Sequence, residues 1–323
     1  MKQSAKGERY PGIEFRAMNS LMAVIGRTDT PLPYWQRPVI RWFEEVEQKA
    51  SRFRPDSDLS RLNRWAPGEP CQVSPTLYRL LRKAWQLAVD TDYLFQPFVG
   101  SALKRLGYDR SFEEVLGAGS SPGANFVGEG SFHPIMEEDA LQFDETAFTV
   151  TRRSEAELDL GGVGKGWSAD GAASFMRREF GITSGLVDAG GDLRVWSDED
   201  PWCIGIEHPE DEETEILQLW INDAGVATSN VLHRRWKQGG LIRHHILDGR
   251  TGLPAQSDVI QATVLAPRTC EAEVAAKIIC MLGADEAVSW METHFPHHGY
   301  VMVKTTGDMI MNQKLYDYAI KVV

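Results

Sequence analysis

Short runs of alternating apolar and polar residues dominate the second half of the chain. They begin near residue 139 and are typical of β-strands. Several neighbouring runs are joined by turns too short for a crossover helix, so antiparallel pairing is expected. We therefore predict an α+β (mixed α/β) fold of mostly antiparallel sheets with flanking helices. The predicted strands are ALQF, FTVTR, SGLVDAG, LRVWS, CIGIEH, ILQLWI, DVIQATVLA and GYVMVK, and the predicted helices cover 37–53, 76–93, 166–180, 271–282 and 284–295.

The composition and charge of the chain limit the kinds of protein that it can be and the partners that it can bind. A chain of 323 residues that is 42% hydrophobic can bury a substantial core. A net charge of −12 without a basic cluster argues against nucleic acid or anionic lipid as a partner. The sequence shows no signal peptide and no membrane-spanning run, so a cytoplasmic location is expected. Reduced, buried thiols are expected at four scattered cysteines, Cys71, Cys203, Cys270 and Cys280.

Two segments have no hydrophobic period. PDSDLSRLN (55–63), between the first two predicted helices, is interpreted as a polar turn. Residues 110–138 are rich in Gly, Ser and Pro and are interpreted as a long surface loop. This loop is a candidate seam in the structure.

A glycine-rich segment, LDLGGVGKGWSAD (158–170), places four glycines around Lys165 and is typical of a phosphate-binding loop. A Walker A loop does not fit, because it requires a glycine in place of Asp159 and a hydroxyl in place of Gly166. A dinucleotide fingerprint can be read over 164–169, after the strand-like AELDL. A lone match of this kind is weak, and a glycine turn that only packs closely is the alternative.

Three more clusters of glycine and polar residues follow, each at the end of a predicted strand: LVDAGGD (186–192), GVATSN (225–230) and HHILDGRTG (244–252). Backbone amides in such turns and at a helix start bind anions, and Lys165 and Arg250 would add positive charge. Several such loops in one chain indicate one extended ligand that contains a pyrophosphate.

Taken in order, nine motifs of the chain resemble those of the ApbE-type flavin transferases, the FAD:protein FMN transferases. The resemblance covers residues 15–305, nearly the whole chain. The motifs are AMNS (17–20), SRFRPDSDLSRLN (51–63), VSPTLYRLLRKA (73–84), FQPFVGSAL (95–103), DLGGVGKGWSAD (159–170), LVDAGGDL (186–193), ATSN (227–230), HHILDGRTGLP (244–254) and AEVAAKIICMLG (272–283).

The resemblance implies an ApbE-like, T-fold-related architecture. Residues 15–305 would form a single FAD-binding domain with its seam at 110–138, preceded by an N-terminal segment, 1–14. The resemblance further implies an enzyme that binds FAD, uses Mg²⁺ and moves the FMN half onto a Thr or Ser hydroxyl of an acceptor flavoprotein, leaving AMP. In such phosphoryl-type transfer, positioning and neutralisation of the pyrophosphate charge matter most.

The resemblance also implies roles for individual residues by their positions in the motifs. The motifs do not reveal the catalytic base, for which His245 and Asp248 are the candidates. The carbonyl of Gly162 is expected to face the metal. The residues expected to bind FAD are Met18, Phe53, Phe95, Gln96, Pro97, Asp159, Lys165, Leu247, Arg250 and Thr251.

The metal-binding motif departs from the family pattern, which is an Asp followed four positions later by a Thr. This chain has Glu273 and Lys277 at these positions. Glutamate can still bind a metal, but a protonated lysine has no lone pair to offer. Either the ammonium takes the place of the metal, or the two residues form an ordinary exposed ion pair along a helix. The family's residues are also replaced at Asn19, Gln96, Asn230 and Gly249.

Two other functions stay open. An FAD-binding protein of the same fold without transferase activity is favoured by the missing threonine. An oxidoreductase that uses the glycine loop as a dinucleotide site is disfavoured, because the loop lacks a clean βαβ frame. Several residues also have structural alternatives, as turn caps (Asp192, Asp248), as the outward-facing member of a histidine pair (His244, His245) or as core residues (Met18, Phe53, Trp167, Trp236).

Overall fold

The computed structural model describes residues 12–27, 34–110, 112, 114, 132–233, 235–238 and 241–323. They divide into two compact units. Unit 1 consists of the described residues up to Glu44, of Val163–Asn230 and of Ser257–Val323, and unit 2 of those in Glu45–Gly162 and Val231–Gln256. The interpretation of 15–305 as one domain stays a prediction, as does the seam at 110–138, most of which lies outside the described residues.

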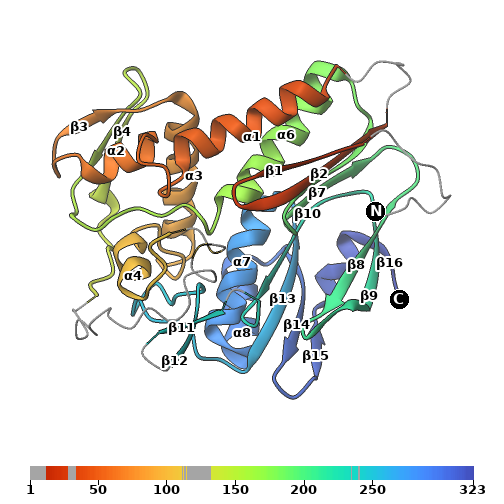
Figure 1. Ribbon diagram of the computed structural model, residues 1–323. Helices are drawn as coiled ribbons and strands as arrows, with labels where there is room; N and C mark the ends of the chain where they lie inside the picture. Colours follow the sequence, from red (N-terminus) through yellow and green to blue (C-terminus); the bar gives the residue numbers. More distant parts are fainter. Residues whose placement is uncertain are drawn as a thin grey trace. The chain divides into compact units, whose positions relative to one another are not determined.

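Unit 1 is built on an eight-stranded sheet in which every pairing is antiparallel (Figure 1). Its strands, in spatial order, are β1 (Gly12–Ala17), β2 (Ser20–Arg27), β6 (Ser184–Ala189), β7 (Leu193–Ser197), β10 (Asp223–Asn230), β13 (Val259–Ala266), β14 (Gly299–Lys304) and β15 (Met309–Met311). The other elements are α1 (Gln36–Ala50), which starts in this unit, α6 (Gly164–Phe180), α7 (Thr269–Leu282), α8 (Ala284–His294), the 3₁₀ helix η2 (Gln313–Asp317), and the strands β8 (Trp202–His208), β9 (Asp211–Ile221) and β16 (Ala319–Val322).

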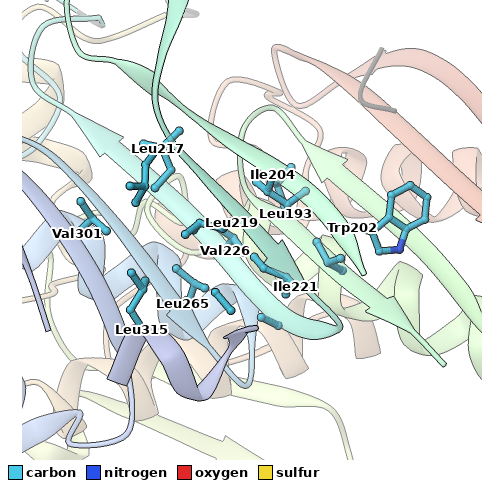
Figure 2. Close-up of a cluster of buried hydrophobic side chains, with 14 of the residues drawn as sticks. Leu193, Trp202, Ile204, Leu217, Leu219, Ile221, Val226, Leu265, Val301 and Leu315 are labelled. Atoms are coloured by element: carbon cyan, nitrogen blue, oxygen red, sulfur yellow. The ribbon is translucent and has the colours of Figure 1, made fainter. Parts of the chain in front are cut away.

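Alternate residues of the central strands face two different cores, as the pleat of a strand requires. On one face, Val187 and Trp196 join a buried cluster with side chains of α1 and α6. On the other face, Leu186 and Val195 pack with apolar residues of the three-stranded sheet β16-β9-β8. Figure 2 shows this second cluster, with Leu193 among side chains that include Leu219. The large sheet is therefore the middle layer of unit 1.

The start of α7 is held by α6. The carboxylate of Asp170, on α6, accepts the backbone N–H groups of Thr269 (3.0 Å) and Cys270 (3.1 Å). Burial raises the pKa of Asp170, although these two N–H groups oppose the shift. The two helices approach closely because Gly166 has no side chain: a Cβ there would lie 2.7 Å from the carbonyl oxygen of Thr269. This contact fixes where the charged residues of α7 lie relative to the glycine-rich loop of α6.

Unit 2 combines helices with small antiparallel sheets. Its longest complete helix, α3 (Pro75–Asp90), is capped by Ser74, whose hydroxyl accepts the N–H of Leu77. The remaining elements are α2 (Asp58–Arg64), β3 (Pro70–Gln72), α4 (Gly100–Arg105), the 3₁₀ helix η1 (Glu138–Ala140), β4 (Leu141–Asp144), β5 (Thr149–Arg152), β11 (Arg235–Gln238) and β12 (Leu241–His244). The strands form two sheets, β3-β5-β4 and β11-β12.

The predicted fold class is confirmed, and so are most of the predicted helices and strands, with small shifts at their ends. The polar turn predicted over 55–63 is wrong, because Ser57 accepts the N–H of Ser60 (3.0 Å) and starts α2. The strand-like AELDL (156–160) is not a strand. The GVATSN cluster does not follow a strand but lies inside β10, which pairs with β7 on one side and β13 on the other. The alternating runs do not predict β1, β2, β3, β11, β15 or β16.

All four cysteines lie in the described part of the chain and carry free thiols. Cys71, Cys270 and Cys280 are buried as predicted, whereas Cys203 is only partly buried. Burial raises the pKa of the Cys280 thiol to about 12. Within the described ranges, every helix is too short or too polar to cross a bilayer.

Candidate functional site

Four charged side chains of unit 1 meet at the start of α6, and we call them the lysine–carboxylate cluster: Lys165, Asp192, Glu273 and Lys277. Lys165 lies in the first turn of α6, Asp192 in the turn between β6 and β7, and Glu273 and Lys277 on α7. Lys165 pairs directly with Asp192, and the Nζ of Lys277 lies 3.1 Å from the Oε1 of Glu273. The Nζ of Lys165 is also 3.9 Å from this Oε1.

Both carboxylates of the cluster are buried, and the ammonium groups are the parts nearer to solvent. The side chain of Glu273 is 0% exposed and that of Asp192 3%, against 13% for Lys277 and 15% for Lys165. Because Glu273 has no exposed surface, the alternative of an ordinary exposed ion pair does not describe this site. Two ammonium groups and two carboxylates sum to a formal charge of zero.

The backbone also contributes to the lysine–carboxylate cluster. The N–H of Gly166 donates to the Oε2 of Glu273 at 2.8 Å, so both oxygens of this carboxylate have donors. Burial alone would raise the pKa of Glu273, but Lys277, Lys165 and this N–H hold it below the ordinary value. Burial raises the pKa of Asp192, while its partner Lys165 opposes the shift. Glu273 is therefore the more firmly ionised of the two carboxylates.

The residues of the cluster do not fit a magnesium ion. Mg²⁺ requires hard oxygen ligands in near-octahedral geometry. Both oxygens of Glu273 already accept hydrogen bonds, and the ammonium of Lys277 has no lone pair. Among the described residues, no three His, Cys, Asp or Glu side chains gather as a metal site would require. The predicted metal contact at Gly162 belongs to unit 2.

Met18 is the other predicted FAD contact of unit 1. Met18 and Asn19 form the tight turn between β1 and β2, with φ of 51° and 54°. The Sδ of Met18 accepts a hydrogen bond from the hydroxyl of Ser168 at 3.7 Å. Its methyl group would lie 3.4 Å from a Cβ added at Gly164. The β1–β2 turn therefore places Met18 against the first turn of α6, beside Lys165.

A second group of residues gathers around Asp159 in unit 2, and we call it the Arg52–Asp159 cluster: Arg52, Phe53, Tyr108, Asp159 and Trp236. The Nε of Arg52 donates to the Oδ2 of Asp159, and its Nη2 donates to the carbonyl of Tyr108 at 2.7 Å. The guanidinium lies 4.1 Å from the ring centroid of Phe53 and 5.1 Å from that of Tyr108. Tyr108 stacks in turn on Trp236, with centroids 5.4 Å apart.

The backbone around Asp159 connects this cluster to other predicted residues. The N–H of Asp159 donates to the carbonyl of Pro97 at 2.8 Å, and its Oδ1 accepts the N–H of Gly161 at 2.9 Å. Gly162, the next residue, ends the first of the two segments of unit 2. The structure therefore brings Phe53, Pro97 and Asp159 together, and their role in binding FAD stays a prediction.

The turn at 248–252 lies against the 93–96 segment. The carbonyl of Asp248 accepts the N–H groups of Thr251 (3.1 Å) and Gly252 (2.8 Å). A Cβ at Gly249 would lie 2.4 Å from the carbonyl oxygen of Leu94, so only glycine allows this close approach. The loop that carries Arg250 and Thr251 is therefore anchored on the loop that carries Phe95 and Gln96.

The two candidates for the catalytic base differ in their surroundings. The carboxylate of Asp248 accepts the backbone N–H of Arg250 (2.8 Å) and its guanidinium Nη2 (2.7 Å). Burial would raise the pKa of Asp248, but these contacts with Arg250 outweigh it and hold the pKa below the ordinary value. A carboxylate stabilised in this way is a poor proton acceptor. His245, half-buried just beyond the end of β12, is the better candidate.

Three predicted residues of unit 2 are buried by contacts within the unit. The side-chain amide of Gln96 donates to the carbonyl of Ile135 (2.9 Å) and accepts the N–H of Phe98 (3.2 Å). Phe95 is 5% exposed. Leu247 packs with Ala102 and Leu103 in a small apolar cluster. These side chains shape the unit, whereas Arg250 and Thr251 are exposed.

Sequence reasoning missed Arg52 and Tyr108. Arg52 lies inside the SRFRPDSDLSRLN motif, directly before Phe53, but an arginine in a polar segment gives no sign that it is buried. Its pairing with Asp159 spans 107 positions of sequence. Only the fold brings the two together.

Asn63, on α2, holds the segment that leads to Asp159. Its Nδ2 donates to the carbonyl of Leu158 (2.9 Å), and its Oδ1 accepts the N–H of Leu158 (2.8 Å). We expect Asn63→Ala to lower the free energy of unfolding by about 2 kcal/mol, because the backbone of Leu158 loses both partners. We also expect Asn63→Ala to weaken FAD binding, because Asp159 is the next residue after Leu158 and would lose its fixed position. Urea denaturation and calorimetric titration with FAD measure the two effects.

Asn312 in unit 1 is the matched control, since its side chain forms the same two-way contact. It accepts the N–H of Tyr300 (3.0 Å) and donates to the carbonyl of His298 (2.9 Å). Asn312→Ala should cost similar stability without changing FAD affinity. If both variants bind FAD as the unchanged chain does, Asn63 does not position Asp159 for a ligand.

Comparison with known protein sequences finds relatives over most of the chain. A model described as the ApbE family matches residues 18–302. The FAD:protein FMN transferase of Vibrio cholerae serotype O1 is 27% identical over 264 residues, which cover 80% of this chain and 76% of that protein. The FAD:protein FMN transferase of Treponema pallidum is 27% identical over 276 residues, which cover 80% of this chain and 74% of that protein.

Comparison with solved structures finds the same fold. The ApbE protein of Thermotoga maritima matches with a TM-score of 0.79 at 22% identity, covering 96% of this chain and 99% of that chain. The flavin transferase ApbE of Vibrio cholerae matches with a TM-score of 0.75 at 21% identity, covering 96% of this chain and 100% of that chain. The predicted ApbE-like architecture is therefore confirmed.

Proposed function

The chain belongs to the ApbE family, and we propose that it is an FAD:protein FMN transferase. In this reaction the FMN half of FAD moves onto a Thr or Ser hydroxyl of an acceptor flavoprotein, and AMP is released. Two relatives carry the name of this activity. Within the molecule, the proposal rests on the lysine–carboxylate cluster, whose partly exposed ammonium groups suit a diphosphate.

In unit 2, the Arg52–Asp159 cluster supports a role in holding the ring systems of FAD. Aromatic faces such as that of Phe53 suit a planar heterocycle, and the carboxylate of Asp159 suits its N–H or O–H donors. Arg250 and Thr251, which are exposed, would contact FAD directly. We assign a shaping role to the buried residues that the motifs single out, namely Phe95, Gln96, Pro97 and Leu247.

In unit 1, we assign the diphosphate to Lys165 and Lys277, with Met18 beside them. The ammonium of Lys277 stands where the family pattern has a metal ligand, so it would offset part of the diphosphate charge itself. Because the residues here do not fit Mg²⁺, FAD binding should survive without added metal. A metal contact at the carbonyl of Gly162 or at Glu273 is accordingly not part of the proposal.

The chemical step follows from the bonds that change. The hydroxyl oxygen of the acceptor attacks the FMN-side phosphorus, a phosphate ester forms, and the bond to the AMP phosphate breaks. The hydroxyl proton passes to a base, for which His245 is preferred over Asp248 because Arg250 stabilises the ionised form of Asp248. Lys165 and Lys277 would stabilise the negative charge that collects on the leaving AMP.

The alternative function is FAD binding without transfer, favoured by the full hydrogen bonding of Glu273 and by Lys277 in the ligand position. The test uses an acceptor protein that the Vibrio cholerae transferase flavinylates, with that enzyme as the positive control. We expect covalent FMN on the acceptor, seen by in-gel fluorescence, together with one AMP per FMN transferred. Tight FAD binding with an unmodified acceptor would instead establish the binding protein. The cytoplasmic location stays a prediction from the sequence.

A further inference from the structure

Arg52 is a buried cation whose surroundings are specific. Its side chain is 3% exposed, and a buried guanidinium is costly unless its charge and its N–H groups are satisfied. Asp159, itself 11% exposed, supplies the opposite charge through Nε. The carbonyl of Tyr108 accepts from Nη2, and the rings of Phe53 and Tyr108 lie over the guanidinium carbon. The guanidinium group of Arg52 is therefore fixed in position and orientation.

One nitrogen of this fixed group is not satisfied. The Nη1 of Arg52 is buried and has no hydrogen-bond acceptor within the part of the chain that the structure describes. A buried donor of this kind normally has an acceptor, from protein, water or ligand. Here it stands beside Asp159 and two aromatic rings, the residues assigned above to the rings of FAD.

We propose that Arg52 is a positioning residue for Asp159 and that its Nη1 donates a hydrogen bond to an acceptor atom of bound FAD. This inference rests on the proposed function. The bond from Nε to Oδ2 fixes the carboxylate of Asp159, while Oδ1 also accepts the N–H of Gly161. The ligand thus meets a carboxylate acceptor and a guanidinium donor at a set spacing, which specifies a molecule with a donor and an acceptor side by side.

Arg152 is a close control within unit 2, because it is also a buried arginine, with 3% of the whole residue exposed. Its Nη2 donates to the carbonyls of Asn63 (3.1 Å) and Trp65 (2.9 Å), and its Nη1 to the carbonyls of Ser154 and Ala156. Its Nε likewise has no acceptor in the described chain. Among the described residues, Arg152 forms no ion pair and no contact with an aromatic ring. The two arginines therefore share burial and one N–H without an acceptor, but only Arg52 has a carboxylate and aromatic rings beside it.

The experiment compares Arg52→Lys with Arg152→Lys. Lysine keeps the charge but cannot hold a carboxylate and an additional acceptor in the planar geometry of arginine. Calorimetric titration with FAD should show affinity reduced about tenfold or more in Arg52→Lys and unchanged in Arg152→Lys. Thermal unfolding should show a loss of stability in both. Parallel titrations with riboflavin and with ADP identify the half of FAD that contacts Nη1, because only that probe should lose affinity.

A double variant tests the positioning role. Because Arg52 acts partly through Asp159, the losses in FAD binding free energy of Arg52→Lys and of Asp159→Asn should overlap, and the double variant should lose less than their sum. Fully additive losses would overturn the positioning role. Unchanged FAD affinity in Arg52→Lys, or an equal loss in Arg152→Lys, would overturn the inference as a whole while leaving the proposed function intact. Failure of the unchanged protein to bind FAD would instead overturn the proposed function.

Discussion

A variant carrying Lys277→Met should have a free energy of unfolding about 3 kcal/mol lower than that of the unchanged chain. Glu273 is fully buried, and the ammonium of Lys277 at 3.1 Å is its main counter-charge. Lys165, at 3.9 Å and already paired with Asp192, compensates only in part. Removing one partner of a buried ion pair leaves an uncompensated charge, which is the costly case. Urea denaturation followed by tryptophan fluorescence measures the loss.

Two controls distinguish the effect of breaking a buried ion pair from the effect of removing any lysine. Glu273→Gln together with Lys277→Met removes both charges and should recover most of the stability, because the amide oxygen can still accept the N–H of Gly166. Lys314→Met breaks an exposed pair with Asp317, whose side chains are 47% and 59% exposed, and should change stability little. Equally small losses in the variants at 277 and 314 would show that the buried pair contributes no more than a surface pair.

The double variant Glu273→Asp with Lys277→Thr should convert the protein to magnesium-dependent FMN transfer. The change removes the ammonium and supplies two oxygen ligands one helical turn apart, the arrangement of the family pattern. Chelation should then lower the transfer rate by about 100-fold, since a bound divalent ion contributes several kcal/mol to phosphoryl transfer. The unchanged protein should vary by less than about twofold across the same magnesium series.

The two single variants are the controls for this conversion. Glu273→Asp retains the ammonium and should gain no magnesium dependence, and Lys277→Thr retains the longer carboxylate and should gain little. Strict magnesium dependence in the unchanged protein would contradict the assignment of Lys277 as a substitute for the metal. So would a double variant that transfers FMN equally well in the presence of chelator.

The elements that the sequence predicted well are those in which apolar residues recur with a clear helical or strand period. α3 and α7 have long apolar faces, and β8 alternates between buried and less buried residues along most of its length. α2 was missed because it has only seven residues and its start depends on one capping hydroxyl, that of Ser57. The GVATSN segment was misplaced because glycine and polar residues resemble a turn, although pairing with strands on both sides holds it in the sheet.

The candidate site was predictable in its parts but not in its contacts. Local motifs singled out Lys165, Glu273 and Lys277, and the i,i+4 spacing already predicted that the last two would pair. Sequence could not reveal that Glu273 is fully buried or that the N–H of Gly166 completes its hydrogen bonds, because that contact joins residues 107 positions apart. Arg52 was missed for the same reason: its partners are set by tertiary packing alone.

The absence of a side chain at position 166 has a consequence for the kind of nucleotide chemistry that this loop supports. In a loop that binds nucleoside triphosphates, the residue after the lysine carries a hydroxyl that reaches a magnesium ion. Here that residue is Gly166, and even one added carbon would collide with the backbone where α7 begins, at Thr269 and Cys270. The packing that holds α6 against the start of α7 thus also excludes a triphosphate-type metal ligand at position 166.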